Sequence, residues 1–211
     1  MGIKAYRTAY LSNFYRQLLL QIVASKGSGL KLLDLGCGSM ELTDRIASSN
    51  RDIIDTITGM DIYAPAVNAS HAAAYQRWDG THIPLEDDSV DVVIASDLIH
   101  HIYPAREQVV KEAARVAQWM IIKDHFEYGP VSRTILRGFD LLGNWRNALY
   151  GANVFPERYF DRQSFSALCA TTGYSVTSIE VGHNVYGDAF RTVFPPSYQF
   201  IALLERVDNA A

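Results

Sequence analysis

The chain has 211 residues and a net charge of −4, and 48% of its residues are hydrophobic, 11% aromatic and 20% charged. This length accommodates one domain with a sizeable core, and the balance of apolar and charged residues excludes a disordered chain. The negative charge has the wrong sign for a protein that grips phosphate backbones, so we expect no nucleic acid partner. We therefore predict a single domain over residues 1–211.

The sequence favours neither a membrane location nor a disulfide-rich fold. No apolar run approaches the roughly 20 residues that a membrane span needs, and the N-terminal segment lacks the apolar stretch of a signal peptide, which favours the cytoplasm. The chain has two cysteines, Cys37 and Cys169, in dissimilar contexts. They form neither a disulfide framework nor a zinc-ligand cluster, so we expect free thiols and no bound metal.

An amphipathic helix is predicted first, and strands then alternate with helices up to residue 123. Apolar and aromatic residues recur every four positions between residues 6 and 25, which is typical of a helix with one buried face. The predicted strands are 30–36, 53–60, 74–77, 90–95 and 119–123, and the further helices are 41–49, 66–74 and 106–117. This alternation indicates an α/β fold with a parallel sheet and helices on both faces, because parallel crossovers must pass over a face.

The segment 126–160 interrupts the alternation, since it contains eight aromatic residues and does not read as a crossover helix. Aromatic side chains line apolar ligand pockets, so we expect a substrate cap here. Asp161 then predicts the N-cap of a helix that ends at Gly173. The stretches 174–181 and 198–206 read as strands joined by turns, which we expect to pair in antiparallel fashion at an edge of the sheet.

The sharpest chemical signal is the turn Gly36-Cys37-Gly38 between a predicted strand and a predicted helix. Glycines there let backbone amides approach a ligand closely. A dinucleotide-binding loop would need a third glycine where this chain has Glu41, and a carboxylate in the first helical turn would repel a pyrophosphate. A nicotinamide-dependent oxidoreductase is therefore disfavoured, and the P-loop string is absent.

Three carboxylates follow or end successive strands. Asp34 precedes the glycines and suits a cationic amino group, Asp61 suits the two hydroxyls of a ribose, and Asp79 is placed to accept from an exocyclic amine. These acids describe a ligand with an amino group, a ribose and an adenine but no phosphate. The pattern predicts S-adenosylmethionine as the cofactor.

Four strings carry a resemblance to a known family: LLDLGCGS (32–39), TGMDIY (58–63), WDGTHIPLEDDSVDVVIASDLIHHI (78–102) and WMIIKDH (119–125). In this order and spacing they resemble the class I S-adenosylmethionine-dependent methyltransferases of the UbiE-like small-molecule type. The resemblance implies a Rossmann-like, mostly parallel seven-stranded sheet with an antiparallel last strand. It also implies methyl transfer to an oxygen or nitrogen of a small acceptor, with S-adenosylhomocysteine as product.

The resemblance also assigns the cofactor site. The implied cofactor-binding residues are Asp34, Leu35, Gly36, Cys37, Gly38, Asp61, Ile62, Asp79, Gly80 and Ser96. The chain departs from the family at Met40, where the family usually has a further glycine. That departure leaves open an alternative, a non-catalytic partner subunit that binds an adenosyl ligand. An N-terminal lid helix over residues 1–28 is a further feature that the resemblance implies.

Methyl transfer from a sulfonium is an in-line displacement, so the enzyme mainly positions the nucleophile, and a hydroxyl acceptor also needs a general base. His101 is the first candidate, at the position where the family usually has histidine, followed by His125 and His100. Arginines in the cap suit an anionic acceptor, although a solvated helix face is an equal interpretation. The predicted substrate contacts are Tyr10, Arg133, Arg137 and Trp145, and we expect a monomer or a homodimer.

Overall fold

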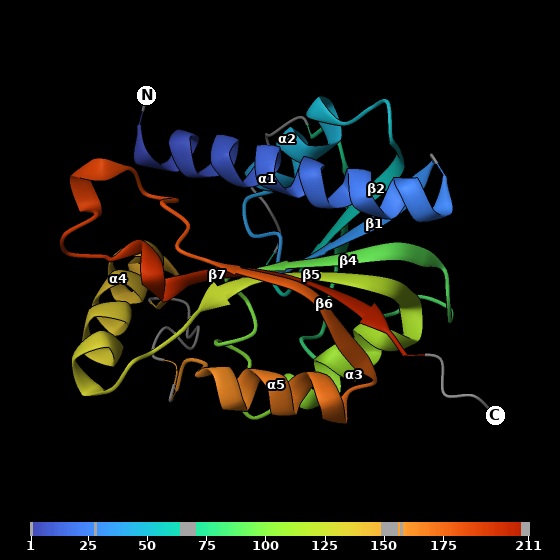
Figure 1. Ribbon diagram of the computed structural model, residues 1–211. Helices are drawn as coiled ribbons and strands as arrows, with labels where there is room; N and C mark the ends of the chain where they lie inside the picture. Colours follow the sequence, from blue (N-terminus) through green and yellow to red (C-terminus); the bar gives the residue numbers. More distant parts are fainter. Residues whose placement is uncertain (1, 28, 64–70, 149–155, 157, 208–211) are drawn as a thin grey trace.

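The computed structural model describes residues 2–27, 29–63, 71–148, 156 and 158–207. Its strands form one seven-stranded sheet in the order β3-β2-β1-β4-β5-β7-β6 (Figure 1). The strands are β1 (Leu30–Leu35), β2 (Ile54–Asp61), β3 (Ala74–Arg77), β4 (Val90–Ser96), β5 (Ala117–His125), β6 (Tyr174–Val181) and β7 (Gln199–Arg206). Strands β1 to β5 pair in parallel, whereas β7 is antiparallel to both β5 and β6. The predicted fold class and the terminal antiparallel pair are confirmed.

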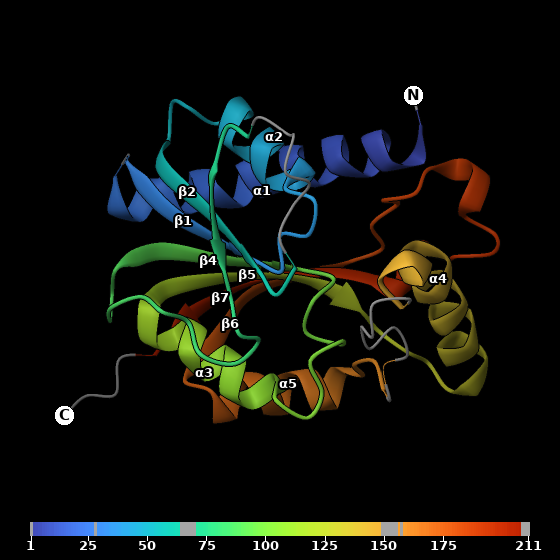
Figure 2. The same cartoon turned by 180° about the vertical axis from the view of Figure 1, so that it is seen from behind.

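Helices cover both faces of the sheet. Helices α1 (Ile3–Lys26) and α2 (Glu41–Ser49) lie on one face, and α3 (Arg106–Val116) and α5 (Arg162–Thr171) lie on the other (Figures 1 and 2). Strand β1 is buried from both sides, since Leu32 packs in the cluster with α1 and Leu33 in the cluster with α3. Burial of both faces explains why the parallel strands read as continuous apolar runs. Among the described residues, no helix combines the length and apolar character that crossing a membrane requires.

Helix α4 (Pro130–Ala148) lies beyond the carboxyl end of β5, next to the segment that connects β6 to β7 (Figure 1). Leu136 of this helix packs with Tyr159 and Phe194 in a small cluster of its own. The segment 126–160 is thus an addition at one end of the sheet and not a crossover. Its role as a substrate cap stays a prediction, and Tyr150 and Phe155 lie outside the described residues.

Two predicted boundaries are wrong. Of the predicted helix 66–74, residues 66–70 lie outside the described part, 71–73 are not helical and Ala74 begins β3. Strand β5 is longer than the predicted 119–123 and includes Asp124 and His125. Pairing with β7 continues to His125, opposite Gln199. The ladder therefore overrides the weak strand preference of aspartate, as tertiary context often does.

The last helix follows its local signals. Asp161 is the N-cap of α5 and accepts a hydrogen bond from the Ser164 backbone N–H, and the Ser164 hydroxyl completes the capping box. Gly173 follows the helix with φ +83°, a left-handed conformation that glycine adopts without a steric penalty. The expected start and stop of this helix are confirmed. Both cysteines are free thiols, as expected.

Candidate active site

The turn after β1 is held against the end of β2. The backbone N–H groups of Gly36 and Cys37 both donate to the Met60 carbonyl oxygen, at 2.7 and 3.1 Å. Gly36 has φ +77°, and a Cβ on this residue would lie 2.8 Å from Leu98 Cδ1. Glycine is therefore required at position 36 for both backbone conformation and space.

Met40 has a left-handed backbone conformation, which glycine adopts more readily than other residues. It has φ +65°, and its side chain is completely buried against Gly59. The left-handed conformation costs about 1–2 kcal/mol for a residue with a Cβ, whereas burial of a methionine side chain contributes about 1.5–3 kcal/mol. Burial of the Met40 side chain against Gly59 therefore anchors the loop to β2.

Substitution of Gly59 by alanine is expected to destabilise the protein by about 1–3 kcal/mol, the usual cost of overpacking. The added Cβ would overlap Met40 Sδ and lie 2.9 Å from Cys37 Sγ. Urea unfolding measures the effect. Gly138→Ala in α4 is the matched control, because its Cβ would meet nothing within 4 Å. Equal stability of Gly59→Ala and the wild type would contradict this packing.

Asp61 and Asp34 flank the glycine turn. The Asp61 carboxylate accepts from the backbone N–H groups of Gly38 and Tyr63, at 2.8 and 2.9 Å. Asp34 is buried and accepts from the Thr43 hydroxyl at 2.5 Å. Burial, with a contribution from the Asp61 charge, raises the pKa of Asp34 to about 7. The structure therefore brings together the two acids that the sequence predicted for the amino and ribose groups.

The other predicted cofactor residues occupy different environments. Asp79 is exposed, and its Oδ1 accepts from the backbone N–H groups of Thr81 and His82, which lower its pKa. Ile62, with 41% of its surface exposed, lies beside Gly80, so an apolar surface is open at the end of β2. Leu35 is buried in the core, and the Ser96 hydroxyl hydrogen-bonds to Tyr15 at 2.6 Å.

A cavity of about 190 Å³ lies between α1 and the glycine turn. Lys4 and Arg7 of α1 line it together with Asp34, the turn and Ser96. Lys4 also pairs with Glu41 at 2.6 Å, which ties α1 to the first turn of α2. Ligand pockets usually measure about 300–1,000 Å³, so this cavity is suited to part of a nucleoside-sized ligand.

Asp97 is the centre of a charge network that the sequence did not reveal. It follows β4 with φ +54° and is paired with Arg7 of α1 at 2.5 Å and with Lys123 of β5. His125 Nε2 lies 3.3 Å from the same carboxylate. Burial alone would raise the pKa of Asp97, but Lys123 and Arg7 outweigh it and hold the pKa well below its usual range. The ionised carboxylate thus links α1 to the ends of β4 and β5.

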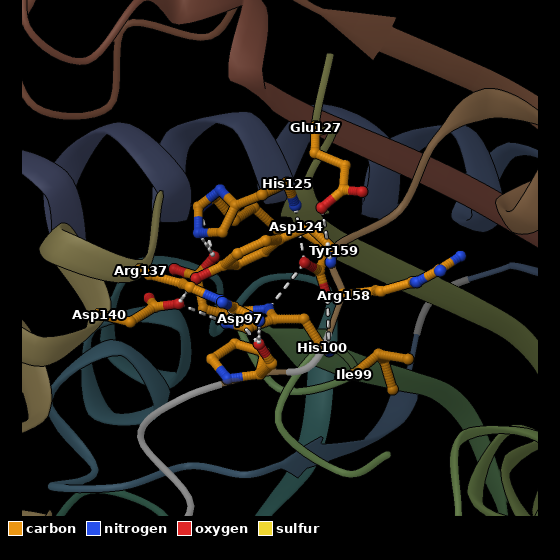
Figure 3. Close-up of polar contacts among 12 residues, drawn as sticks. Asp97, Ile99, His100, Asp124, His125, Glu127, Arg137, Asp140, Arg158 and Tyr159 are labelled. Atoms are coloured by element: carbon orange, nitrogen blue, oxygen red, sulfur yellow. Dashed lines mark hydrogen bonds and ion pairs between the residues drawn. The ribbon is translucent and has the colours of Figure 1, made fainter. Parts of the chain in front are cut away.

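His100 is the centre of a second buried cluster (Figure 3). Its Nδ1 lies 2.7 Å from Asp124 Oδ1, and its backbone N–H donates to the other oxygen of Asp124. On the opposite side of the ring, Nε2 lies 3.5 Å from Asp140 Oδ2, an oxygen that also accepts from the Tyr159 hydroxyl. Burial lowers the pKa of His100, but Asp124 outweighs it, and the net effect raises the pKa to about 10.

The other two candidate bases are neutral near pH 7. Burial lowers the pKa of His101 to about 4, with the His100 charge contributing. Burial, followed by the Lys123 charge, lowers the pKa of His125 to about 3. The rings of His100 and His101 are tilted, with their centroids 4.0 Å apart. The structure thus brings the three predicted histidines together at one end of the sheet.

Three of the predicted substrate residues each contact a different partner. Tyr10 hydrogen-bonds to His183 Nδ1 at 3.1 Å. Arg133 forms a two-pronged pair with Glu127, at 2.8 and 2.5 Å, and Arg137 donates to the Pro156 carbonyl. The side chain of Trp145 lies outside the described residues. Binding of an anionic acceptor by these arginines therefore stays a prediction, with the Arg133 guanidinium already engaged by a carboxylate.

Comparison with known proteins agrees with this geometry. Residues 33–118 match the profile of a methyltransferase domain family. The 27-O-demethylrifamycin SV methyltransferase of Amycolatopsis mediterranei is 35% identical over 99 residues, which cover 42% of this chain and 35% of that protein. The chain thus matches little more than a third of that relative's length.

Solved structures share the fold. One is magnesium protoporphyrin IX methyltransferase from Synechocystis with bound S-adenosylhomocysteine, which has a TM-score of 0.58 and 15% sequence identity. The superposition covers 94% of this chain and 84% of the Synechocystis chain. A methyltransferase from Methanosarcina mazei gives 0.60 at 15% identity, with 85% and 93% covered. With its glycine turn, its strand-end acids and a match to a methyltransferase domain over residues 33–118, this chain is similar to the class I S-adenosylmethionine-dependent methyltransferases.

Proposed function

We propose that this protein transfers the methyl group of S-adenosylmethionine to an oxygen or nitrogen of a small-molecule acceptor. The observation that carries the proposal is the cavity beside the glycine turn, which Asp34 lines although its side chain is otherwise buried. A buried carboxylate that opens only onto a cavity fits a cationic group of a ligand. Bound there, the cofactor supplies an electrophilic methyl group on a sulfonium.

Each part of the cofactor has a candidate partner in this chain. Asp34 holds the amino group, Asp61 accepts from the ribose hydroxyls, and the exposed side chain of Ile62 lies against the adenine beside Asp79. Asp61 has an acceptor site left on each oxygen, since each accepts one backbone N–H and a carboxylate has about four lone-pair sites. Helix α1, which lines the cavity, would cover the cofactor, and α4 would cover the acceptor.

His101 is the best candidate for the general base. A base must hold an unprotonated nitrogen near pH 7, and the lowered pKa of His101 satisfies this, whereas the raised pKa of His100 does not. His125 is also neutral, but it is more deeply buried and faces Asp97. In the proposed reaction, His101 accepts the proton of an acceptor hydroxyl as that oxygen takes the methyl group.

The proposal is tested first with the cofactor product, because the acceptor is unidentified. Calorimetric titration with S-adenosylhomocysteine is expected to give one site per chain with a micromolar Kd. A screen of hydroxyl and amine acceptors then measures the formation of S-adenosylhomocysteine from S-adenosylmethionine. Binding without turnover of any acceptor would favour the non-catalytic partner subunit, and absence of binding at millimolar ligand would contradict the cofactor assignment.

His101→Ala is expected to lower kcat with a hydroxyl acceptor by about 100-fold or more, the usual contribution of a general base. The Kd for S-adenosylhomocysteine should remain that of the wild type, because His101 does not line the cofactor cavity. His82→Ala is the matched control, since His82 is an exposed histidine that pairs with Glu112. An unchanged kcat in His101→Ala would assign the base elsewhere or show that the acceptor needs none.

A further inference from the structure

Three buried side chains from different elements meet beneath α4: His100, which follows β4, His125, the last residue of β5, and Asp140 of α4. One possible ligand atom of each lies within 4.8 Å of the other two. His100 and His125 are 0% and 2% exposed, and Asp140 is 9% exposed. The sequence analysis named the two histidines as candidate bases but not Asp140, because Asp140 lies 40 positions after His100 in a different element.

The two histidines each have a nitrogen without a hydrogen-bond partner. Among the described residues, His100 Nε2 and His125 Nδ1 are buried and accept or donate no hydrogen bond. Leaving one buried polar atom unsatisfied costs about 1–3 kcal/mol, and His100 Nε2 is faced only by the Asp140 carboxylate at 3.5 Å. Imidazole nitrogens are the commonest protein ligands of metal ions, and a bound ion would displace the proton that His100 otherwise holds.

Each of the three side chains is also oriented by an outer partner. His100 Nδ1 lies 2.7 Å from Asp124, and His125 Nε2 lies 3.3 Å from Asp97. The Tyr159 hydroxyl donates to Asp140 (Figure 3). Carboxylates on the far nitrogens of ligand histidines fix the ring and the tautomer in known metal sites. Here Asp124 holds His100 with its Nε2 facing Asp140, and the His125 nitrogen that faces the group is Nε2, beside Asp97 (Figure 3).

From this arrangement we propose that His100, His125 and Asp140 bind one divalent first-row transition metal ion. Two imidazoles and one carboxylate suit Zn²⁺, Co²⁺ or Fe²⁺, whereas Ca²⁺ and Mg²⁺ prefer oxygen ligands alone. Three protein ligands leave at least one coordination position for water or an acceptor oxygen. The ion would join the ends of β4 and β5 to α4 and so hold the cap on the sheet. This site goes beyond the proposed methyl transfer, which requires no metal.

The test is a metal titration of the full chain after dialysis against a chelator. Zn²⁺ is titrated by calorimetry, and Co²⁺ by its visible absorption, which reports histidine and carboxylate coordination. We expect one ion per chain and a higher midpoint of thermal unfolding with metal. Asp140→Asn should weaken the affinity by at least about tenfold, as loss of a metal-site group does.

His82→Ala is the matched control, because His82 is an exposed histidine beside a carboxylate, Glu112. It should bind metal as the wild type does. Far-UV circular dichroism and titration with S-adenosylhomocysteine check that Asp140→Asn is folded, since Asp140 lies outside the cofactor cavity. His125→Asn is a second variant with the same expected loss.

Two results would overturn the metal site: absence of Zn²⁺ and Co²⁺ binding by the wild type, or wild-type affinity in both Asp140→Asn and His125→Asn. Absence of metal binding would mean that His100 is instead a protonated imidazolium, paired with Asp124 through Nδ1 and with Asp140 through Nε2. Because the cofactor titration and the metal titration use different ligands and different residues, failure of this site is distinguishable from failure of the proposed methyl transfer.

Discussion

Replacement of Asp61 by alanine is expected to weaken the affinity for S-adenosylhomocysteine by about 100-fold or more. A hydrogen bond to a charged group contributes about 1.5–3 kcal/mol, and Asp61 is proposed to accept two from the ribose. The carboxylate also accepts from the backbone N–H groups of Gly38 and Tyr63, so its loss releases the turn that lines the cavity. Both effects act in the same direction, and calorimetric titration measures their sum.

Asp79→Ala provides the comparison within the same site. Asp79 is exposed, and its Oδ1 is already engaged by Thr81 and His82, so we expect a loss in affinity of roughly tenfold, the equivalent of one hydrogen bond. Asp61→Asn separates the two effects of Asp61, because the amide keeps one acceptor oxygen and the shape of the side chain. A larger loss in Asp79→Ala than in Asp61→Ala would contradict the assignment of the ribose to Asp61.

Local sequence patterns were sufficient to predict the strands and the acids at their ends. Asp34 and Asp61 lie beside the turn because each falls at the end of a strand, and parallel strands end at the same edge of the sheet. The turn at residues 36–38 was likewise predictable, because glycine spacing is a property of the local backbone. The prediction of S-adenosylmethionine as the cofactor rests on these short-range features.

The charge networks depend on contacts between distant segments, which a single sequence does not encode visibly. Arg7 and Asp97 are separated by 90 positions, and they meet because α1 packs over the carboxyl ends of the strands. Lys123 reads as the polar end of an apolar run, yet it is fully buried because Asp97 neutralises it. Asp140 lies in a helix that reads as part of an aromatic cap, so its approach to His100 was not predictable.

The affinity for S-adenosylhomocysteine is expected to fall about tenfold for each pH unit below 7, because the pKa of Asp34 is raised to about 7. Below that pH the unliganded protein holds Asp34 neutral, and the ligand's ammonium group loses its charged partner. Above pH 7 Asp34 is ionised, and its titration should no longer make the affinity depend on pH. Titrations between pH 5 and 8 test this, and the Asp34→Asn variant should bind weakly with no such pH dependence.

The stability of the unliganded protein should change in the opposite sense. A pKa that folding raises favours the folded state at low pH, and this contribution is lost as the pH rises from the usual aspartate range to about 7. The pKa of Asp34 rises from 3.8 to about 7 on folding, and this difference corresponds to at most about 4 kcal/mol in the free energy of unfolding. Urea unfolding gives the free energy of unfolding of the wild type and of Asp34→Asn at each pH. The difference between the two isolates the pH dependence that Asp34 causes from that of the other groups. A flat difference between pH 4 and 8 would show that Asp34 titrates normally. The opposite signs for binding and stability would instead show that the fold tolerates a costly buried carboxylate which the bound ligand stabilises.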